Sequence, residues 1–157
     1  MIIVTDSSAL VALSYCNSLH LLDQLFGKVV VPQVVYNECV IENKSQSEQL
    51  RTYLYDKIED IDISQPLDLP SNLGQGEVSA MLLYKKLNAN FLFVDDNRAR
   101  KIAKYNNINI IGSIGVLILA KQQNLIKKIT PLLDKLDKSN LYISPKLILK
   151  VKELANE

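Results

Sequence analysis

Short apolar runs recur along the chain, and segments with helical periodicity separate them. Ile2–Val4 is the first run, and a run that is apolar throughout is typical of a strand buried on both faces of a parallel sheet. Similar runs predict strands at 28–31, 91–94 and 108–111. Residues 58–63 alternate apolar and acidic side chains, which predicts an edge strand or an extended connector.

Helix-start signals follow these runs, as Asp6-Ser7-Ser8 and Gly74-Gln75-Gly76 illustrate. The predicted helices span about 9–13, 19–26, 32–41, 45–55, 74–87, 97–105, 112–124, 131–138 and 145–155. Strands alternating with helices predict an α/β fold, a three-layer α/β/α sandwich with a mainly parallel central sheet. No stretch has the composition of a linker, so we expect a single domain over residues 1–157.

Composition excludes several classes of protein. Hydrophobic residues make up 48% of the 157 residues and the net charge is +1, which argues against disorder. Apolar runs are too short for a membrane span, and the N-terminus lacks the basic region of a signal peptide. Cys16 and Cys39 form no CxxC pair, which favours a reducing, cytoplasmic location. The single histidine, His20, excludes a His-rich zinc site and makes a Ser-His-Asp triad improbable.

The small net charge conceals an asymmetry between the two halves of the chain. Residues 1–80 carry a net charge of −7 and residues 81–157 a net charge of +8. Folding could place a carboxylate cluster beside a surface that attracts phosphate. Alternatively, lysines simply coat the outer faces of the later helices, and this observation alone favours that interpretation.

Acidic residues follow two of the predicted strands. Asp6 comes after the first strand and Asp95-Asp96 after the strand at 91–94, and ligands gather at the carboxyl ends of strands in open parallel sheets. Each acid could instead be a helix N-cap. An acidic doublet beside another strand-end acid is harder to explain in that way, because unneutralised carboxylates repel each other.

Two glutamates extend this set. Glu38 shares a predicted inward face with Val34 and Ile41, so it occupies a position where a core prefers an apolar side chain. Either a buried salt bridge or a bound cation would compensate its charge. Glu77 lies in the first turn of the helix that Gly74-Gln75-Gly76 opens, where the helix dipole also favours an acid.

Oxygen ligands alone select hard divalent ions such as Mg²⁺ or Mn²⁺. One or two such ions can activate water and stabilise in-line attack on a phosphodiester, and no side-chain nucleophile is then needed. The candidate catalytic and metal-binding residues are Asp6, Glu38, Glu77, Asp95 and Asp96, with the choice between the last two left open. Arg98, Lys101 and Lys104 follow on one helix and are candidates for binding RNA phosphates, although Arg98 and Arg100 could instead pair with nearby acids.

An ordered set of short motifs resembles the PIN-domain family, and among its members the prokaryotic VapC-like branch. The motifs are Val4–Leu10, Val31–Glu38, Leu73–Glu77, Val94–Arg100 and Ile111–Leu117. The resemblance maps the family's first three acids onto Asp6, Glu38 and Glu77, with glutamate where many relatives have aspartate at the third position. The fourth acid maps onto the Asp95-Asp96 pair.

The resemblance implies a Mg²⁺- or Mn²⁺-dependent endoribonuclease, the toxin component of a toxin–antitoxin pair, with an antitoxin protein as partner and a homodimeric state. The alternative is a non-catalytic module that binds nucleic acid or protein. Apolar residues at 19–26 and 45–55 and the segment 141–144 agree with an association surface. They could equally cover the protein's own core, which is the commoner use of such residues.

Overall fold

The computed structural model describes residues 1–41, 44–61, 69–70, 72–139 and 141–157. A five-stranded sheet with the order β3-β2-β1-β4-β5 forms its centre, and every neighbouring pair is parallel. The strands are β1 (Ile2–Thr5), β2 (Lys28–Pro32), β3 (Ile58–Glu59), β4 (Phe91–Phe93) and β5 (Ile110–Ile111). The predicted parallel sheet is confirmed. The segment predicted at 58–63 contributes only the short edge strand β3, and its last two residues lie outside the described residues.

Both faces of the sheet are buried. Ile3 and Val4 are neighbours in β1 and both are fully buried, yet they belong to two separate hydrophobic clusters. Val30 in β2 likewise belongs to a different cluster from Val29 and Val31. Because successive side chains of a strand point to opposite faces, each face of the sheet has its own core. This explains why the central strands are apolar throughout.

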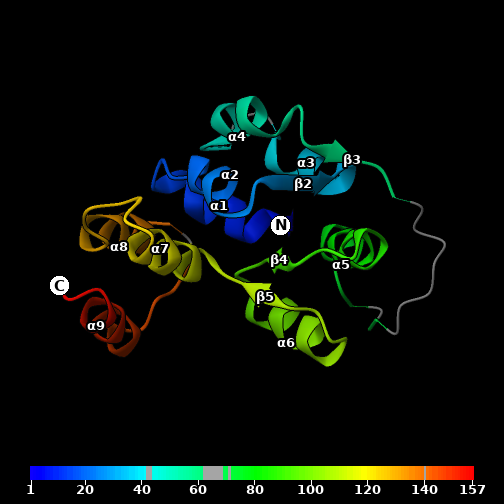
Figure 1. The fold of residues 1–157 in the computed structure, drawn as a ribbon. Coiled ribbons are helices and arrows are strands. Elements are labelled where there is room, and N and C mark those ends of the chain that lie inside the picture. The colour runs from blue at the N-terminus through cyan, green and yellow to red at the C-terminus, as the bar shows by residue number, and fades with distance from the viewer. Residues whose placement is uncertain (42–43, 62–68, 71, 140) are drawn as a thin grey trace.

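Helices cover these two cores (Figure 1). One cluster takes residues from α5 (Gln75–Leu87) and α6 (Asn97–Tyr105). The other takes residues from α1 (Ser7–Tyr15), α2 (His20–Phe26), α3 (Gln33–Cys39), α4 (Ser47–Leu54), α7 (Ser113–Gln122), α8 (Thr130–Asp137) and α9 (Pro145–Leu154). Each predicted helix is present, with its ends shifted by a few residues at most. Gly27 ends α2 as predicted, with a φ of 83° that favours glycine.

The strand order creates a crevice between β1 and β4. From β1 the chain crosses to β2 through α1 and α2, and from β4 it crosses to β5 through α6, which packs on the other face. The connections therefore diverge at the carboxyl ends of β1 and β4, which is where ligands bind in open α/β sheets. The backbone amide of Asp6 donates to the carbonyl of Phe93 at 2.9 Å, which joins the ends of the two strands.

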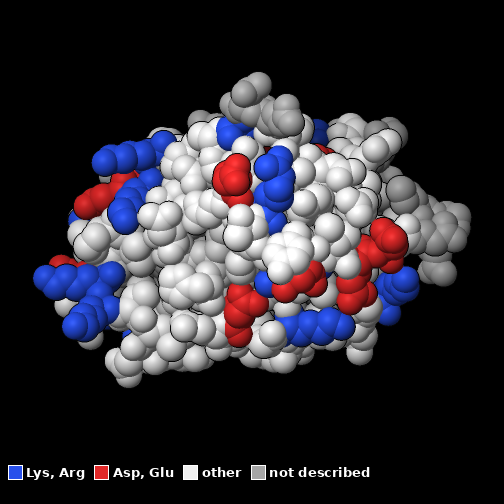
Figure 2. Space-filling view, turned by 90° about the horizontal axis from the view of Figure 1, so that it is seen from above, with Lys and Arg blue, Asp and Glu red and all other residues white. Residues whose placement is uncertain are grey.

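The charge asymmetry is visible on the surface over α4 and β3. Figure 2 shows basic side chains gathered at the end of the molecule formed by the C-terminal helices, whereas acidic and basic side chains are interspersed over the rest of this face. On the face shown, lysines coat the later helices, in agreement with the simpler interpretation. None of the described helices has the length and apolar character needed to cross a membrane.

Candidate active site

Asp6 is the most buried of the candidate acids. It follows β1, and only 3% of its surface is exposed. The Ser8 hydroxyl donates to Asp6 Oδ2 at 2.9 Å, whereas Oδ1 is buried without a hydrogen-bond partner among the described residues. The pKa of Asp6 is raised from 3.8 to about 6, mainly by burial and to a smaller extent by the negative charge of Glu77, against the opposing effect of hydrogen bonds from Ser8 and Ser7. The free oxygen and the raised pKa mark Asp6 as a carboxylate that lacks a counter-charge.

Ser8 connects Asp6 to the acidic doublet. Its hydroxyl oxygen accepts hydrogen bonds from the backbone amides of Asp95 at 3.2 Å and of Asp96 at 3.4 Å. The sequence suggested only an N-cap role for Ser7 and Ser8, and no side-chain cap hydrogen bond occurs at the start of α1. The contact joins residues 87 positions apart, so no local pattern could have revealed it.

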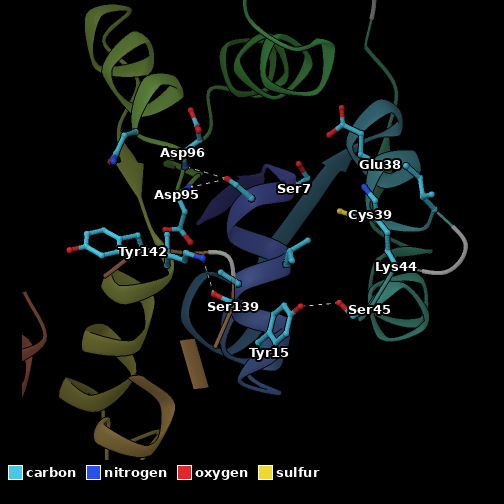
Figure 3. A pocket seen from close by; sticks show the side chains of 16 residues that line it. Ser7, Tyr15, Glu38, Cys39, Lys44, Ser45, Asp95, Asp96, Ser139 and Tyr142 are labelled. Carbon is cyan, nitrogen blue, oxygen red and sulfur yellow. Dashed lines mark hydrogen bonds between the residues drawn. The ribbon is translucent and has the colours of Figure 1, made fainter. Parts of the chain in front are cut away.

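Asp95 and Asp96 have different environments. Asp95 Oδ1 accepts a hydrogen bond from the Ser113 amide at 2.9 Å, at the start of α7, and Oδ2 is buried without a partner among the described residues. Burial raises the pKa of Asp95. Asp96 is exposed and caps α6, with Oδ1 accepting from the Ala99 amide at 2.8 Å. In Figure 3 the Asp96 and Glu38 carboxylates point to the top of the view, whereas that of Asp95 points the other way.

Glu38 does not lie on the core-facing side of α3, so the predicted inward face was wrong. The buried residues of α3 are Val35 and Cys39, and Ile41 lies beyond the helix end with 48% of its surface exposed. This phase turns Glu38 towards α5 instead of the core. A Cβ atom on Gly76 would lie 2.6 Å from Glu38 Oε1 and 2.7 Å from Oε2. Only glycine at position 76 leaves room for this carboxylate.

Glu77 lies in the first turn of α5, as predicted. Its Oε2 accepts a hydrogen bond from the Gly74 amide at 3.0 Å and lies 3.9 Å from Nη2 of Arg98. The same Arg98 nitrogen donates to the carbonyl of Asn72 at 2.8 Å. Arg98 therefore connects α6 to the start of α5. Its contacts agree with the alternative in which this arginine pairs with a nearby acid.

The other basic residues of α6 are of two kinds. Arg100 donates to the carbonyl of Val94 at 3.0 Å, so it also makes a contact inside the protein. Lys101 and Lys104 are exposed on α6. They are the better candidates for contacts to a phosphate backbone.

A groove of about 720 Å³ runs beside the acids (Figure 3). Glu38, Asp95 and Asp96 contribute to its lining, together with residues of α1 and of two segments near positions 41–45 and 139–142. The structure thus places three of the candidate acids around one groove. Asp6, which follows β1, and Glu77, at the start of α5, are not among its lining residues.

The carboxylates have the chemistry of a Mg²⁺ or Mn²⁺ site. All candidate ligands are oxygens, and Asp6 offers a buried Oδ1 that no other group satisfies. In the part of the chain that the structure describes, no three His, Cys, Asp or Glu side chains form a ready-made metal cluster. Proteins often hold Mg²⁺ with one or two carboxylates, and waters and substrate phosphate complete its coordination. The residues therefore fit an ion of this kind.

Comparison with known proteins agrees with this fold. A family model described as DUF3368, a PIN domain, matches residues 2–157. Among solved structures, the chain is similar to a PilT N-terminus domain protein, SSO1118, from the hyperthermophilic archaeon Sulfolobus solfataricus P2. That similarity has 17% sequence identity and a TM-score of 0.53, and it covers 92% of this chain and all of the other. No curated protein matches the sequence.

Proposed function

The chain belongs to the PIN-domain family, and from this premise we propose that it is a Mg²⁺- or Mn²⁺-dependent endoribonuclease that hydrolyses RNA phosphodiester bonds. PIN domains are generally nucleases and typically use divalent metal ions. The observation that carries the proposal is the unsatisfied Oδ1 of Asp6, buried at the β1–β4 crevice. A buried carboxylate without a partner destabilises the fold, and a bound cation relieves that cost.

The proposal divides the acids between two roles. One or two ions would be held by Asp6, Glu38, Glu77 and Asp96. Asp95 would instead fix the segment between β4 and α6 by its hydrogen bond from the first residue of α7. A bound ion lowers the pKa of its water and stabilises the charge that develops on the phosphate. Asp96 is preferred to Asp95 as a ligand because its carboxylate points in the same direction as that of Glu38 in Figure 3, whereas that of Asp95 points the other way.

The test is cleavage of a mixed RNA by the purified protein in Mn²⁺, with EDTA as the metal-free control. We expect Asp6→Asn and Asp96→Asn to lower the rate at least a hundredfold. Asp134→Asn, an exposed acid on α8, is the matched control and should leave it unchanged. Equal rates for the wild type and Asp6→Asn, or no cleavage by either, would contradict the proposal.

A non-catalytic nucleic-acid-binding module is the second candidate. The exposed Lys101 and Lys104 on α6 would serve such a module as well as they would serve a nuclease. Such a module would bind RNA equally well in EDTA and in Mn²⁺, and Asp6→Asn would not alter its affinity. Binding without cleavage in both conditions would establish it.

The resemblance to VapC-like proteins supports a further part of the proposal, that this nuclease is a toxin held inactive by an antitoxin protein. Co-purification of the tagged chain from its native host tests this part. A stoichiometric small protein that suppresses RNA cleavage is the expected result. Recovery of the active chain alone would contradict it.

A further inference from the structure

The groove beside the carboxylates has a lining of two kinds. Its acidic lining comes from Glu38, Asp95 and Asp96. Its apolar lining comes from Val11 and Ala12 on α1 and from Ile41 and Leu141 on the two segments near positions 41–45 and 139–142. The acids account for part of this groove, and nothing in the proposed metal chemistry requires the apolar part.

Polar and aromatic groups border this apolar part. The Tyr15 hydroxyl and Ser45 Oγ are 2.8 Å apart, which links the end of α1 to the segment beyond α3. Lys44 is the only lysine or arginine among the described lining residues. Tyr142 also contributes to the lining, and 85% of its surface is exposed. The groove therefore combines apolar side chains, two phenol rings and one cation.

We propose that this groove binds one nucleotide of the substrate strand beside the cleaved bond. Its base would lie against Val11, Ile41 and Leu141, and its phosphate would lie at Lys44. The inference rests on the proposed nuclease function and names a subsite for it. A volume of about 720 Å³ lies within the range of small-ligand sites.

The chemistry of the lining selects an unpaired base. Proteins that read single strands place bases against aromatic and apolar side chains and track the phosphates with cations. In a duplex the faces of the bases are stacked on one another, so they cannot contact Val11 or Ile41. The subsite therefore favours single-stranded over double-stranded substrates.

A tryptophan reporter tests the subsite without any cleavage. The chain contains no tryptophan, so Tyr142→Trp introduces a single fluorophore at the edge of the groove. Titration with uridine and adenosine monophosphates in EDTA should quench its emission in a saturable way. Tyr55→Trp, at an exposed tyrosine outside this groove, is the matched control and should show no saturable quenching. Equal responses of the two reporters would overturn the proposal.

Lys44→Ala in the Tyr142→Trp background identifies the phosphate contact. The affinity of this variant for nucleoside monophosphates should fall about three- to tenfold, because a charge-assisted contact is lost. It should then equal the affinity for the corresponding nucleosides. The affinity for uridine or adenosine should not change. Lys146→Ala, an exposed lysine on α9, is the control. An unchanged monophosphate affinity in Lys44→Ala would overturn the assignment of this lysine.

These titrations separate the subsite from the nuclease activity. Saturable quenching by nucleotides in a protein that cleaves no RNA would support the subsite and contradict the nuclease. Cleavage of RNA without saturable quenching would support the nuclease and contradict the subsite. Quenching by an acidic peptide but not by nucleotides would also overturn the subsite, and would assign the groove to a protein partner.

Discussion

The Asp6 carboxylate lies where its own charge is unfavourable. Its Oδ2 has the Ser8 hydroxyl as a donor, but its Oδ1 has none among the described residues, and 97% of the residue is removed from solvent. Burial raises its pKa from 3.8 to about 6. In the metal-free protein this acid is therefore a source of instability at neutral pH.

The stability of the metal-free protein should depend on pH through this residue. Because the pKa of Asp6 is higher in the folded state, protonated Asp6 contributes to the stability of the folded protein. This contribution is fully present below about pH 3.8 and is lost as the pH rises through about 6. With about 1.4 kcal/mol for each pH unit in this interval, the loss between pH 4.5 and pH 7.5 is roughly 2 kcal/mol. In urea unfolding in EDTA, the free energy of unfolding of Asp6→Asn should therefore exceed that of the wild type by more at pH 7.5 than at pH 4.5.

Bound metal should make the wild type more stable than Asp6→Asn, which reverses their order of stability in EDTA. A ligand that binds only the folded state at a hundredfold excess over its Kd adds about 2.7 kcal/mol to the free energy of unfolding. Millimolar Mn²⁺ should thus stabilise the wild type and leave Asp6→Asn unchanged. The same stabilisation of both proteins would place the metal away from Asp6.

Two glycines of one turn offer a matched pair of substitutions. A Cβ at Gly76 would lie 2.6 Å from Glu38 Oε1, at the flexible end of that side chain, whereas a Cβ at Gly74 would meet Glu77 at an ordinary 3.6 Å. Gly76→Ala should therefore displace the Glu38 carboxylate and lower RNA cleavage at least tenfold, with little change in Tm. Gly74→Ala should retain both activity and Tm. Full activity in Gly76→Ala would show that the position of Glu38 is not needed.

At the level of elements, α3 shows where prediction from sequence reaches its limit. The strand-to-helix alternation located this helix, but its seven residues make barely two turns, and two phases of its apolar residues are possible. Packing on α1 and β2 selected the phase with Val35 and Cys39 inward, which no short pattern encodes. The three aspartates were located by their place after strands, and Glu77 by its place in the first turn of a helix. The contacts of Ser8 and Gly76 with these acids and with Glu38 join distant segments, so the sequence could not reveal them.

Helix α6 carries the prediction on RNA binding. Arg98 is engaged with Asn72 and Glu77, so the exposed Lys101 and Lys104 should supply the phosphate contacts. Each phosphate contact on single-stranded RNA contributes about 0.7 to the slope of log affinity against log salt. The double variant Lys101→Ala/Lys104→Ala should reduce the magnitude of that slope by about 1.4 in fluorescence anisotropy.

Lys150→Ala/Lys152→Ala on α9 is the control for the change in net charge and should keep the wild-type slope. An unchanged slope in the α6 variant would mean that these lysines only solvate the helix. Loss of affinity in Arg98→Ala at constant slope would confirm that this arginine positions Glu77 and makes no phosphate contact.

For the whole molecule, the sheet was predictable because its strands are apolar on both faces, but the surface was not. The leucines that agreed with an association surface in α2 and α4 are buried in the protein's own core, so the alternative interpretation of these residues is confirmed. They are Leu21, Leu22, Leu25, Leu50 and Leu54. A count of apolar residues could not reveal this, because how many the core absorbs depends on how the helices pack on the sheet.

Of the segment 141–144, Ile143 is buried and Tyr142 is exposed, and helix α9, which follows this segment, offers a further surface for a homodimer. Leu149 and Leu154 are 64% and 60% exposed, and the helix places only Val151 fully in the core. Light scattering at micromolar concentration should give twice the 17.7 kDa mass of one chain, and Leu149→Lys/Leu154→Lys should give one chain without loss of Tm. Tyr105→Lys, at a tyrosine that is 81% exposed on α6, is the control and should stay dimeric. A wild-type mass of one chain would contradict the dimer, and a dimeric leucine variant would move its interface away from α9.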